Sequence, residues 1–315
     1  MNEIQLGKAG PFVSRLGLGT MMMGWRLAQA ESEKVIASAH EQGISLIDTS
    51  ISYARGGCHQ IIGQSLRNLK LQDKFFIATK VGGIADDSDP PDHRGYSRRN
   101  IIRQCELSLT QLGVDCIDLL QLHFPTKEFE YQEMLEALIL LRSQGKIKYF
   151  GVCNYTVDDM QSVLAYAKEN AALKPLTNQF EYNLLNFQQQ ELLFSQLETA
   201  GIGSITWGPL ASGLLRDWYA KNAVAQPGSR IDTSREKDQK IALLNEPSTQ
   251  KILKALTQLS AETKLPAHAI AIIWQLKKNP ANCTLLGPSS LAQFNDLLSH
   301  IEIDSAYPVN FASLL

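Results

Sequence analysis

The stretch Leu46-Ile47-Asp48-Thr49-Ser50-Ile51-Ser52-Tyr53 is the part of the sequence from which both the fold and the site are inferred. An apolar run, Ile44–Ile47, leads into Asp48 and is typical of a buried strand. Because an acid at the end of a buried strand faces a pocket more readily than an apolar interior, Asp48 is a candidate site residue. Tyr53 follows closely enough to reach the same pocket. Taken alone, an Asp after a strand is more often a turn former or a helix cap, so the rest of the chain must decide.

Strand and helix patterns alternate along the chain and predict an α/β fold. Eight strands are expected, at Leu16–Gly19, Ile44–Ile47, Phe75–Thr79, Ile117–Leu122, Tyr149–Val152, Leu176–Gln179, Ser204–Trp207 and Cys283–Leu286. Helical patterns lie between them, at Glu33–Gln42, Ile101–Leu112, Met134–Gln144, Asp158–Glu169 and Gln188–Glu198. This alternation is typical of repeated βα units with a parallel sheet. Eight units favour closure into a (β/α)8 TIM barrel over an open doubly wound sheet.

Two features depart from this alternation of strands and helices. Ile4–Leu6 and Phe12–Val13 surround a turn-rich link and predict an N-terminal β-hairpin. After the seventh strand, the polar stretch Arg216–Pro247 predicts a long surface loop. The helices Gln250–Glu262 and Ala267–Lys277 follow it. No composition shift marks a boundary, so residues 1–315 are expected to form one barrel domain.

Composition argues against several classes of protein. The 315 residues are 44% hydrophobic and carry a net charge of −2, so no basic field favours nucleic acid or an anionic membrane. No signal sequence or apolar run long enough to span a membrane is evident. The five cysteines are odd in number and form no C-x-x-C pair, which predicts reduced thiols in the cytoplasm. The histidines lack metal-ligand spacing, so no metal is expected.

Ionisable residues follow three of the expected strands. Asp48, Lys80 and His123 each come directly after an apolar run. Because all strands of a parallel barrel open onto one face with their carboxyl ends, these side chains and Tyr53 are expected to converge there. A lone Lys at a strand end is usually a surface residue, and a lone His is usually a structural hydrogen bonder. The combination of all four favours a catalytic site.

The chemistry of these groups suits carbonyl reduction. A hydride added to a carbonyl carbon requires a proton for the oxygen, and a Tyr hydroxyl is a poor acid at its ordinary pKa of about 10. A cationic Lys80 nearby would lower the pKa of Tyr53, and Asp48 would keep Lys80 charged and in place. A neutral His123 could donate to the carbonyl oxygen and orient the substrate.

The sequence resembles the aldo-keto reductase superfamily, whose members are (β/α)8 barrels that reduce aldehydes and ketones with a nicotinamide cofactor. The resemblance runs from the hairpin to about Leu298. It rests on these segments: Leu16-Gly17-Leu18-Gly19-Thr20, Ile47-Asp48-Thr49, Tyr53, Ala78-Thr79-Lys80, Asp118–His123, Gly145–Asn154, Gln179–Leu185 and Gly208–Gly213. It implies that Tyr53 is the proton donor, that Lys80 and Asp48 tune it, and that His123 orients the carbonyl group.

The resemblance also implies a dinucleotide that lies extended across the barrel mouth; a Rossmann site is not indicated, since G-x-G-x-x-G is absent. Asn154 and Gln179 would pair with the nicotinamide amide, and Trp207 would stack on its ring. The other candidate cofactor-binding residues are Thr20, Leu210, Ser212, Gly213, Gly287, Ser289, Ser290, Gln293 and Asp296. The alternative for Asn154 and Gln179 is that they are ordinary loop amides, and the alternative for Trp207 is that it packs in the core.

The choice of cofactor depends on the adenosine end, where the family pattern is matched less well. The chain has Asn295-Asp296 where members usually have Glu-Asn, and it lacks the Lys or Arg that many of them place on a 2′-phosphate. Ser289, Ser290 and Gln293 could bind that phosphate, and Arg216 or Arg230 of the long loop could supply charge. NADP(H) is expected, with NAD(H) as its competitor.

The substrate is expected to be a small carbonyl compound. Met23 and Trp25 follow the first barrel strand and should line its pocket, with core packing as the alternative. One of Arg26, Arg55 and Arg94 could bind an acidic substrate, although solvated loop charges are more common. A redox sensor with slow turnover, or a Schiff-base aldolase that uses Lys80, would be the competing functions. The oligomeric state stays open.

Overall fold

The computed structural model describes residues 2–85, 88, 90, 93–219, 222, 224–301 and 311. Within them, eight parallel strands close into a barrel in the order β10-β3-β4-β5-β6-β7-β8-β9. Their bounds are β3 (Leu16–Gly19), β4 (Leu46–Asp48), β5 (Phe76–Val81), β6 (Ile117–Leu122), β7 (Ile147–Cys153), β8 (Thr177–Glu181), β9 (Gly203–Trp207) and β10 (Asn282–Leu286). The predicted (β/α)8 barrel is confirmed.

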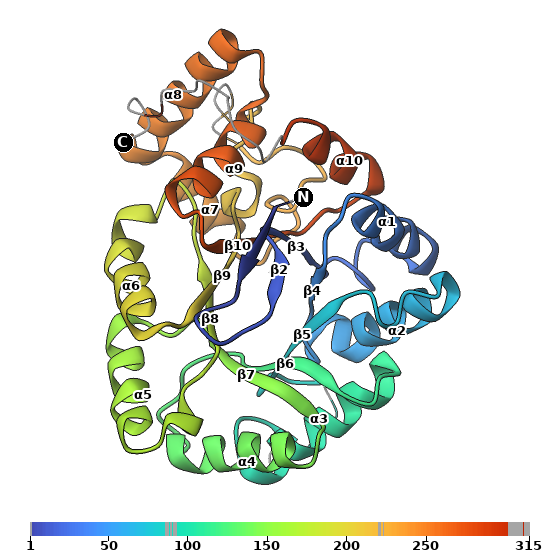
Figure 1. Ribbon diagram of the computed structural model, residues 1–315. Coiled ribbons are helices and arrows are strands. Elements are labelled where there is room, and N and C mark those ends of the chain that lie inside the picture. The colour runs from blue at the N-terminus through green and yellow to red at the C-terminus, as the bar shows by residue number, and fades with distance from the viewer. Residues whose placement is uncertain are drawn as a thin grey trace.

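Helices surround the barrel on all sides (Figure 1). They are α1 (Gln29–Glu41), α2 (Gly57–Leu69), α3 (Arg98–Leu112), α4 (Tyr131–Ser143), α5 (Val157–Glu169), α6 (Phe187–Ala200), α7 (Lys237–Leu244), α8 (Pro247–Thr263), α9 (Ala267–Lys278) and α10 (Leu291–Ser299). All the expected helices form, with ends that differ by a few residues. The sequence analysis did not predict three of these helices. One is α2, which begins with glycine, another is α7, which lies in a polar stretch, and the third is α10, which is short.

The predicted hairpin forms from β1 (Glu3–Gln5) and β2 (Phe12–Ser14), which pair antiparallel. It lies across the barrel in Figure 1. Leu6 and Val13 are fully buried and pack in one cluster with Leu46 and Leu119 of the barrel interior. Burial of this apolar surface closes the amino-terminal end of the barrel, which leaves the carboxyl end for a site.

The register of the strands brings polar residues together at the carboxyl end. Gly19 lies opposite Asp48, Lys80 opposite Gln121, and Cys153 opposite Gln179. Lys80 belongs to β5 rather than following it, so the expected strand end at Thr79 was too early. Because side chains alternate along a strand, Lys80 points to the same interior face as Ala78, two residues before it.

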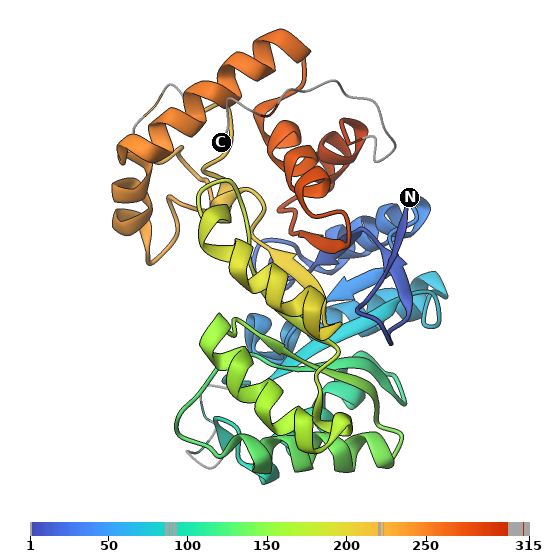
Figure 2. The ribbon, with the colours of Figure 1, turned by 60° about the vertical axis from the view of Figure 1, so that its left-hand side comes forward.

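The long loop predicted after the seventh strand is present, but its last part is helical. Residues 208–236 connect β9 to α7, and a 3-10 turn at Ala211–Gly213 lies near their start. Figure 2 shows α7 and α8 set away from the strands. Among the described helices, none has the length and apolarity that a membrane span requires.

Candidate active site

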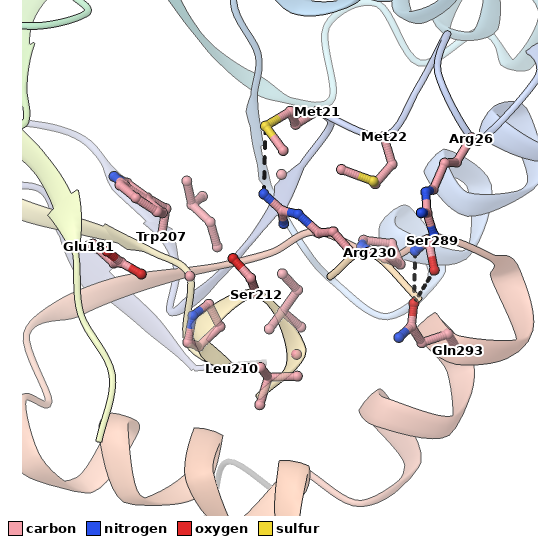
Figure 3. Close-up of a pocket in the computed structure, with 18 of the residues that line it drawn as sticks. Met21, Met22, Arg26, Glu181, Trp207, Leu210, Ser212, Arg230, Ser289 and Gln293 are labelled. Atoms are coloured by element: carbon pink, nitrogen blue, oxygen red, sulfur yellow. Dashed lines mark hydrogen bonds between the residues drawn. The ribbon is translucent and has the colours of Figure 1, made fainter. Parts of the chain in front are cut away.

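A cavity of about 910 Å³ opens at the carboxyl end of the barrel. This volume is at the upper end of the range for small-molecule and cofactor sites. Most of the candidate residues line it: Thr20, Asp48, Tyr53, His123, Asn154, Gln179, Trp207, Leu210, Ser212, Gly213, Gly287, Ser289, Gln293 and Asp296. Figure 3 shows part of this lining, contributed by loops that are far apart in sequence.

Lys80 lies beneath the cavity floor and joins Asp48 to Tyr53. Its Nζ donates to both carboxylate oxygens of Asp48, at 2.7 and 2.6 Å, and to the backbone oxygen of Thr49 at 2.9 Å. It also lies 3.3 Å from Tyr53 Oη. Only 1% of Lys80 is exposed, so this ion pair is shielded from water and held in one geometry.

The charges of this cluster act on Tyr53 in opposite directions. Burial raises the pKa of Tyr53 to about 12, while the Lys80 ammonium lowers it and the Asp48 carboxylate raises it. Lys80 therefore acts in the predicted direction but does not outweigh burial. Burial also favours neutral Lys80, yet Asp48 and Tyr53 together raise the pKa of Lys80 above its ordinary value. Tyr53 is thus a phenol beside an ammonium group at neutral pH.

His123 is neutral and faces the same cavity. Burial, with a smaller effect of the Lys80 charge, lowers its pKa to about 3. Its Nδ1 lies 3.3 Å from Ser50 Oγ, and its ring stacks on Phe124 with centroids 4.3 Å apart. The Tyr53 and His123 rings meet edge to face at 6.1 Å. A carbonyl oxygen between them would have two neutral donors.

The residues expected around a nicotinamide ring are linked by hydrogen bonds to each other and to Asp48 and His123. Gln179 Nε2 donates to Asp48 Oδ1 at 2.7 Å. Asn154 Nδ2 donates to the His123 backbone oxygen at 3.0 Å, and Asn154 Oδ1 accepts from Trp207 Nε1 at 3.1 Å. Each amide keeps hydrogen-bonding capacity, because an amide group has two donors and two lone pairs.

The opposite side of the cavity carries hydroxyls and cations. Lys240 Nζ donates to Ser212 Oγ at 3.1 Å. Gln293 Oε1 accepts from both the backbone N and Oγ of Ser289, each at 2.8 Å, as Figure 3 shows. His268 Nε2 lies 3.3 Å from a carboxylate oxygen of Asp296. Burial and the charge of Arg216 lower the pKa of His268.

Strained backbone is concentrated around the cavity. Ala54, Arg55, Asn154, Ala211 and Ser212 have positive φ angles of 48–63°. The first two directly follow Tyr53, and Asn154 and Ser212 line the cavity. Non-glycine residues in this region cost free energy and persist where surrounding contacts impose them, which is common at functional sites.

Three candidate residues lie elsewhere. Ser290 caps α10, where its Oγ accepts from Gln293 N at 3.1 Å, and it does not line the cavity. Met23 is 1% exposed and packs in the core, which is the alternative that the sequence left open. Trp25 is 54% exposed and outside the cavity lining.

Of the three successive methionines, Met21 and Met22 line the cavity instead of Met23. Arg26 also lines it, whereas Arg55 and Arg94 do not.

Several cavity residues were not singled out from the sequence. Glu181 could have been found by extending the expected strand Leu176–Gln179 by two residues, since it ends β8. Phe124 follows His123 directly. Lys240 and His268 lie in α7 and α9, where no local pattern marks a site. In the part of the chain that the structure describes, no three metal-ligating side chains are grouped to hold an ion.

The chain was also compared with known protein families. The model of the aldo/keto reductase family matches residues 15–306, which is most of the chain. This match agrees with the closed barrel and with the segments quoted above. This family match supports an oxidoreductase that reduces carbonyl groups. The chain therefore belongs to the aldo/keto reductase family.

Proposed function

We propose that this protein reduces aldehydes or ketones to alcohols by direct hydride transfer from NADP(H). The observation that carries the proposal is the buried Lys80, which holds both Asp48 and Tyr53 at the floor of a large cavity. A buried ion pair is weak evidence for a structural role, because well-packed apolar side chains of similar volume are often as stable or more stable. The Lys80 ammonium is instead suited to stabilising the phenolate that Tyr53 becomes when it releases its proton.

The donor set fits a nicotinamide cofactor. The amides of Asn154 and Gln179 and the indole of Trp207 would hold the nicotinamide group. Backbone groups of Leu210 and Gly213, with Ser212 and Lys240, would hold phosphates. When bound, the cofactor supplies the hydride that reaches the carbonyl carbon.

The protein's own residues handle the proton and the substrate. Tyr53 donates its hydroxyl proton to the carbonyl oxygen, and Lys80, 3.3 Å away, stabilises the phenolate that remains. Asp48 keeps Lys80 charged. His123 donates a second hydrogen bond to the carbonyl oxygen, which stabilises the charge that develops there.

NADP(H) is our choice over NAD(H). Ser289 and Gln293 at the start of α10 could bind a 2′-phosphate, and Arg216 adds positive charge on the same side of the cavity. The Asp296 carboxylate beside His268 opposes this choice. Fluorescence titration should therefore give tighter binding of NADPH than of NADH, and equal or tighter NADH binding would reverse the assignment.

The test of the activity is cofactor oxidation with a reactive aromatic aldehyde, for wild type and Tyr53→Phe. We expect turnover to fall by about 10²-fold or more in the variant while its Kd for NADPH stays the same. Tyr166→Phe, on α5, is the matched control. Equal rates for Tyr53→Phe and wild type would remove Tyr53 as the acid. Absence of turnover with tight nucleotide binding would favour a redox sensor.

We further propose that the protein acts on small molecules in the cytoplasm. The five cysteines are unpaired, which suits a reducing compartment. The cavity is lined by residues suited to a dinucleotide and a small carbonyl compound rather than to a polymer. Size-exclusion chromatography would establish the oligomeric state.

A further inference from the structure

Tyr96 is a buried tyrosine that the mechanism above does not use. It lies in the connection between β5 and α3, outside the cavity lining, and only 5% of it is exposed. Its Oη accepts a hydrogen bond from the backbone N of Phe124 at 2.7 Å. Because Phe124 directly follows His123, this hydroxyl is attached to the backbone next to a residue that faces the substrate.

The peptide group between His123 and Phe124 is held by a side chain on each side. Its N–H group, which belongs to Phe124, donates to Tyr96 Oη. Its oxygen, which belongs to His123, accepts from Asn154 Nδ2 at 3.0 Å. The backbone N of His123 donates to Val81 O at 3.1 Å. Because the planar peptide groups on either side of a residue set the direction of its side chain, these bonds orient the imidazole of His123.

The backbone that carries Tyr96 is itself fixed by α3. Asn100 Nδ2 donates to Gly95 O at 2.8 Å, and Ser97 Oγ accepts from Asn100 N at 3.2 Å. These two bonds hold the residues on either side of Tyr96. The hydroxyl of Tyr96 is therefore in place before a substrate binds, which is the condition for a residue that supports a catalytic group.

Two glycines directly after β5 provide the space for this contact. Gly82 has a φ of 97°, and a Cβ there would lie 2.0 Å from the Tyr96 ring. A Cβ on Gly83 would lie 3.7 Å from His123 Nδ1. The buried Gln104 of α3 holds both glycines, since its Oε1 accepts from Gly82 N at 2.7 Å and its Nε2 donates to Gly83 O at 2.8 Å. The tyrosine ring thus packs directly on the backbone beside His123.

We propose that Tyr96 is a positioning residue for carbonyl reduction, and that its hydroxyl holds His123 in the orientation from which Nε2 donates to the substrate. The inference rests on the proposed reductase function. A donor stabilises the developing charge only at the right distance and angle, so a small misplacement lowers the rate strongly. Phe124 is 52% exposed, so water can replace the hydroxyl as partner of its N–H group. Loss of the hydroxyl therefore leaves the fold intact and the orientation of His123 less defined.

The test is a double-mutant cycle that combines Tyr96→Phe with His123→Ala and follows NADPH oxidation with 4-nitrobenzaldehyde. Tyr96→Phe removes one oxygen atom and should lower kcat about 5- to 10-fold, the equivalent of one ordinary hydrogen bond. The Kd for NADPH should not change. In the His123→Ala background the same change should lower kcat by less than about twofold, because the imidazole on which it acts is gone. Two effects that multiply in the double variant would overturn the inference, and so would equal kcat values for wild type and Tyr96→Phe.

Tyr131→Phe, on α4, is the matched control. In the described part of the chain the Tyr131 hydroxyl has no hydrogen-bond partner, and the residue lies outside the cavity lining. Its replacement should leave kcat unchanged in both backgrounds. A fall as large as that for Tyr96→Phe would mean that loss of any buried tyrosine hydroxyl slows the reaction, and the specific role of Tyr96 would be wrong.

Amide hydrogen exchange tests the contact without any turnover. The Phe124 amide should be protected in wild type and should exchange about tenfold faster in Tyr96→Phe, because one hydrogen bond is lost. The His123 amide, which is bonded to Val81 O, should exchange at the same rate in both proteins. An unprotected Phe124 amide in wild type would overturn the inference, whatever the variant does.

Failure of the reductase function would be visible separately. If wild type reduced no aldehyde, the proposed activity would be wrong, and the imidazole NMR signals of His123 would still test the positioning. These signals report the stacking of the imidazole on Phe124, whose ring centroid lies 4.3 Å away. They should shift in Tyr96→Phe and not in Tyr131→Phe. Identical signals in Tyr96→Phe and wild type would overturn the inference.

Discussion

Ser50 Oγ lies 3.3 Å from Nδ1 of His123 and 2.9 Å from Ser52 Oγ. Ser50 also accepts from the backbone N of Ser52 at 3.3 Å. If the Ser52 hydroxyl donates to Ser50, then Ser50 donates to Nδ1, and the proton of neutral His123 stays on Nε2. That tautomer is the one that lets Nε2 donate to a carbonyl oxygen.

Ser50→Ala should therefore reduce kcat for carbonyl reduction by about 5- to 10-fold, the equivalent of one ordinary hydrogen bond. The Kd for NADPH should not change. Nitrogen-15 NMR should show protonated Nε2 in wild type and a mixture of tautomers in the variant. Ser65→Ala, which removes a buried hydroxyl on α2, is the control. An unchanged histidine spectrum would exclude this role for Ser50.

Lys80 and Asp48 should be coupled in stability as well as in catalysis. Lys80→Met leaves the Asp48 carboxylate buried, with Gln179 Nε2 still donating to it. We expect the free energy of unfolding to fall by about 3–5 kcal/mol, because breaking a buried pair leaves an uncompensated charge. The double variant Lys80→Met/Asp48→Asn should lose less than the sum of the two single losses. Urea denaturation measures all four proteins, and additivity within about 0.5 kcal/mol would contradict the coupling.

Trp207 should contribute to cofactor binding with its ring face and with its N–H group. Trp207→Phe keeps an aromatic face but removes the donor to Asn154 Oδ1, so a loss of a few-fold in NADPH affinity is expected. Trp207→Leu removes both and should cost about tenfold, since an aromatic pair is worth roughly 0.5–1.5 kcal/mol. Calorimetry gives the Kd, and Trp218→Leu, outside the cavity lining, is the control. Equal affinities for all the proteins would argue against stacking.

The sequence predicted that the candidate catalytic residues lie together, because the positions of most of them follow from strand ends. Asp48 and His123 end or follow apolar runs, and closure of a parallel barrel brings all such ends to one face. The pairing of Lys80 with Gln121 and of Cys153 with Gln179 then sets the depth of each side chain. Local sequence patterns, together with the rule that parallel barrel strands end on one face, were sufficient to predict that these side chains converge.

The same reasoning could not orient the loops. Three successive methionines, at positions 21–23, have no period that tells which of them faces the cavity. A tight turn, in which Met23 N donates to Thr20 O and Leu27 N to Met22 O, directs Met23 into the core. Ser290 fits a phosphate ligand and a helix cap equally well by residue type, and only the three-dimensional structure shows the cap. The segment that carries Arg230 is held by Arg26, about 200 residues earlier in the chain, which donates to the backbone oxygens of Gly228 and Ser229.

Two buried histidines should make the protein sensitive to acid. Burial, with a smaller effect of Lys80, lowers the pKa of both His59 and His123 to about 3, against an unfolded value near 6.5. Between these values the unfolded chain binds protons that the native protein excludes. The stability from each histidine is thus complete above pH 6.5 and is lost as pH falls toward 3.

Each imidazole should contribute a slope of about 1.4 kcal/mol per pH unit to the free energy of unfolding in this window. His59 is fully buried on α2, bonds Thr79 Oγ1 at 2.8 Å and lies outside the cavity lining, so it can be changed without touching the site. His59→Gln should reduce the slope between pH 6 and pH 5 by that amount, whatever its effect on stability at pH 7. Urea denaturation at several pH values measures the slope, with His40→Gln, which replaces an exposed histidine on α1, as the control. A slope for His59→Gln equal to that of wild type would mean that His59 is protonated in the native protein, and the acid sensitivity would then have to come from other groups.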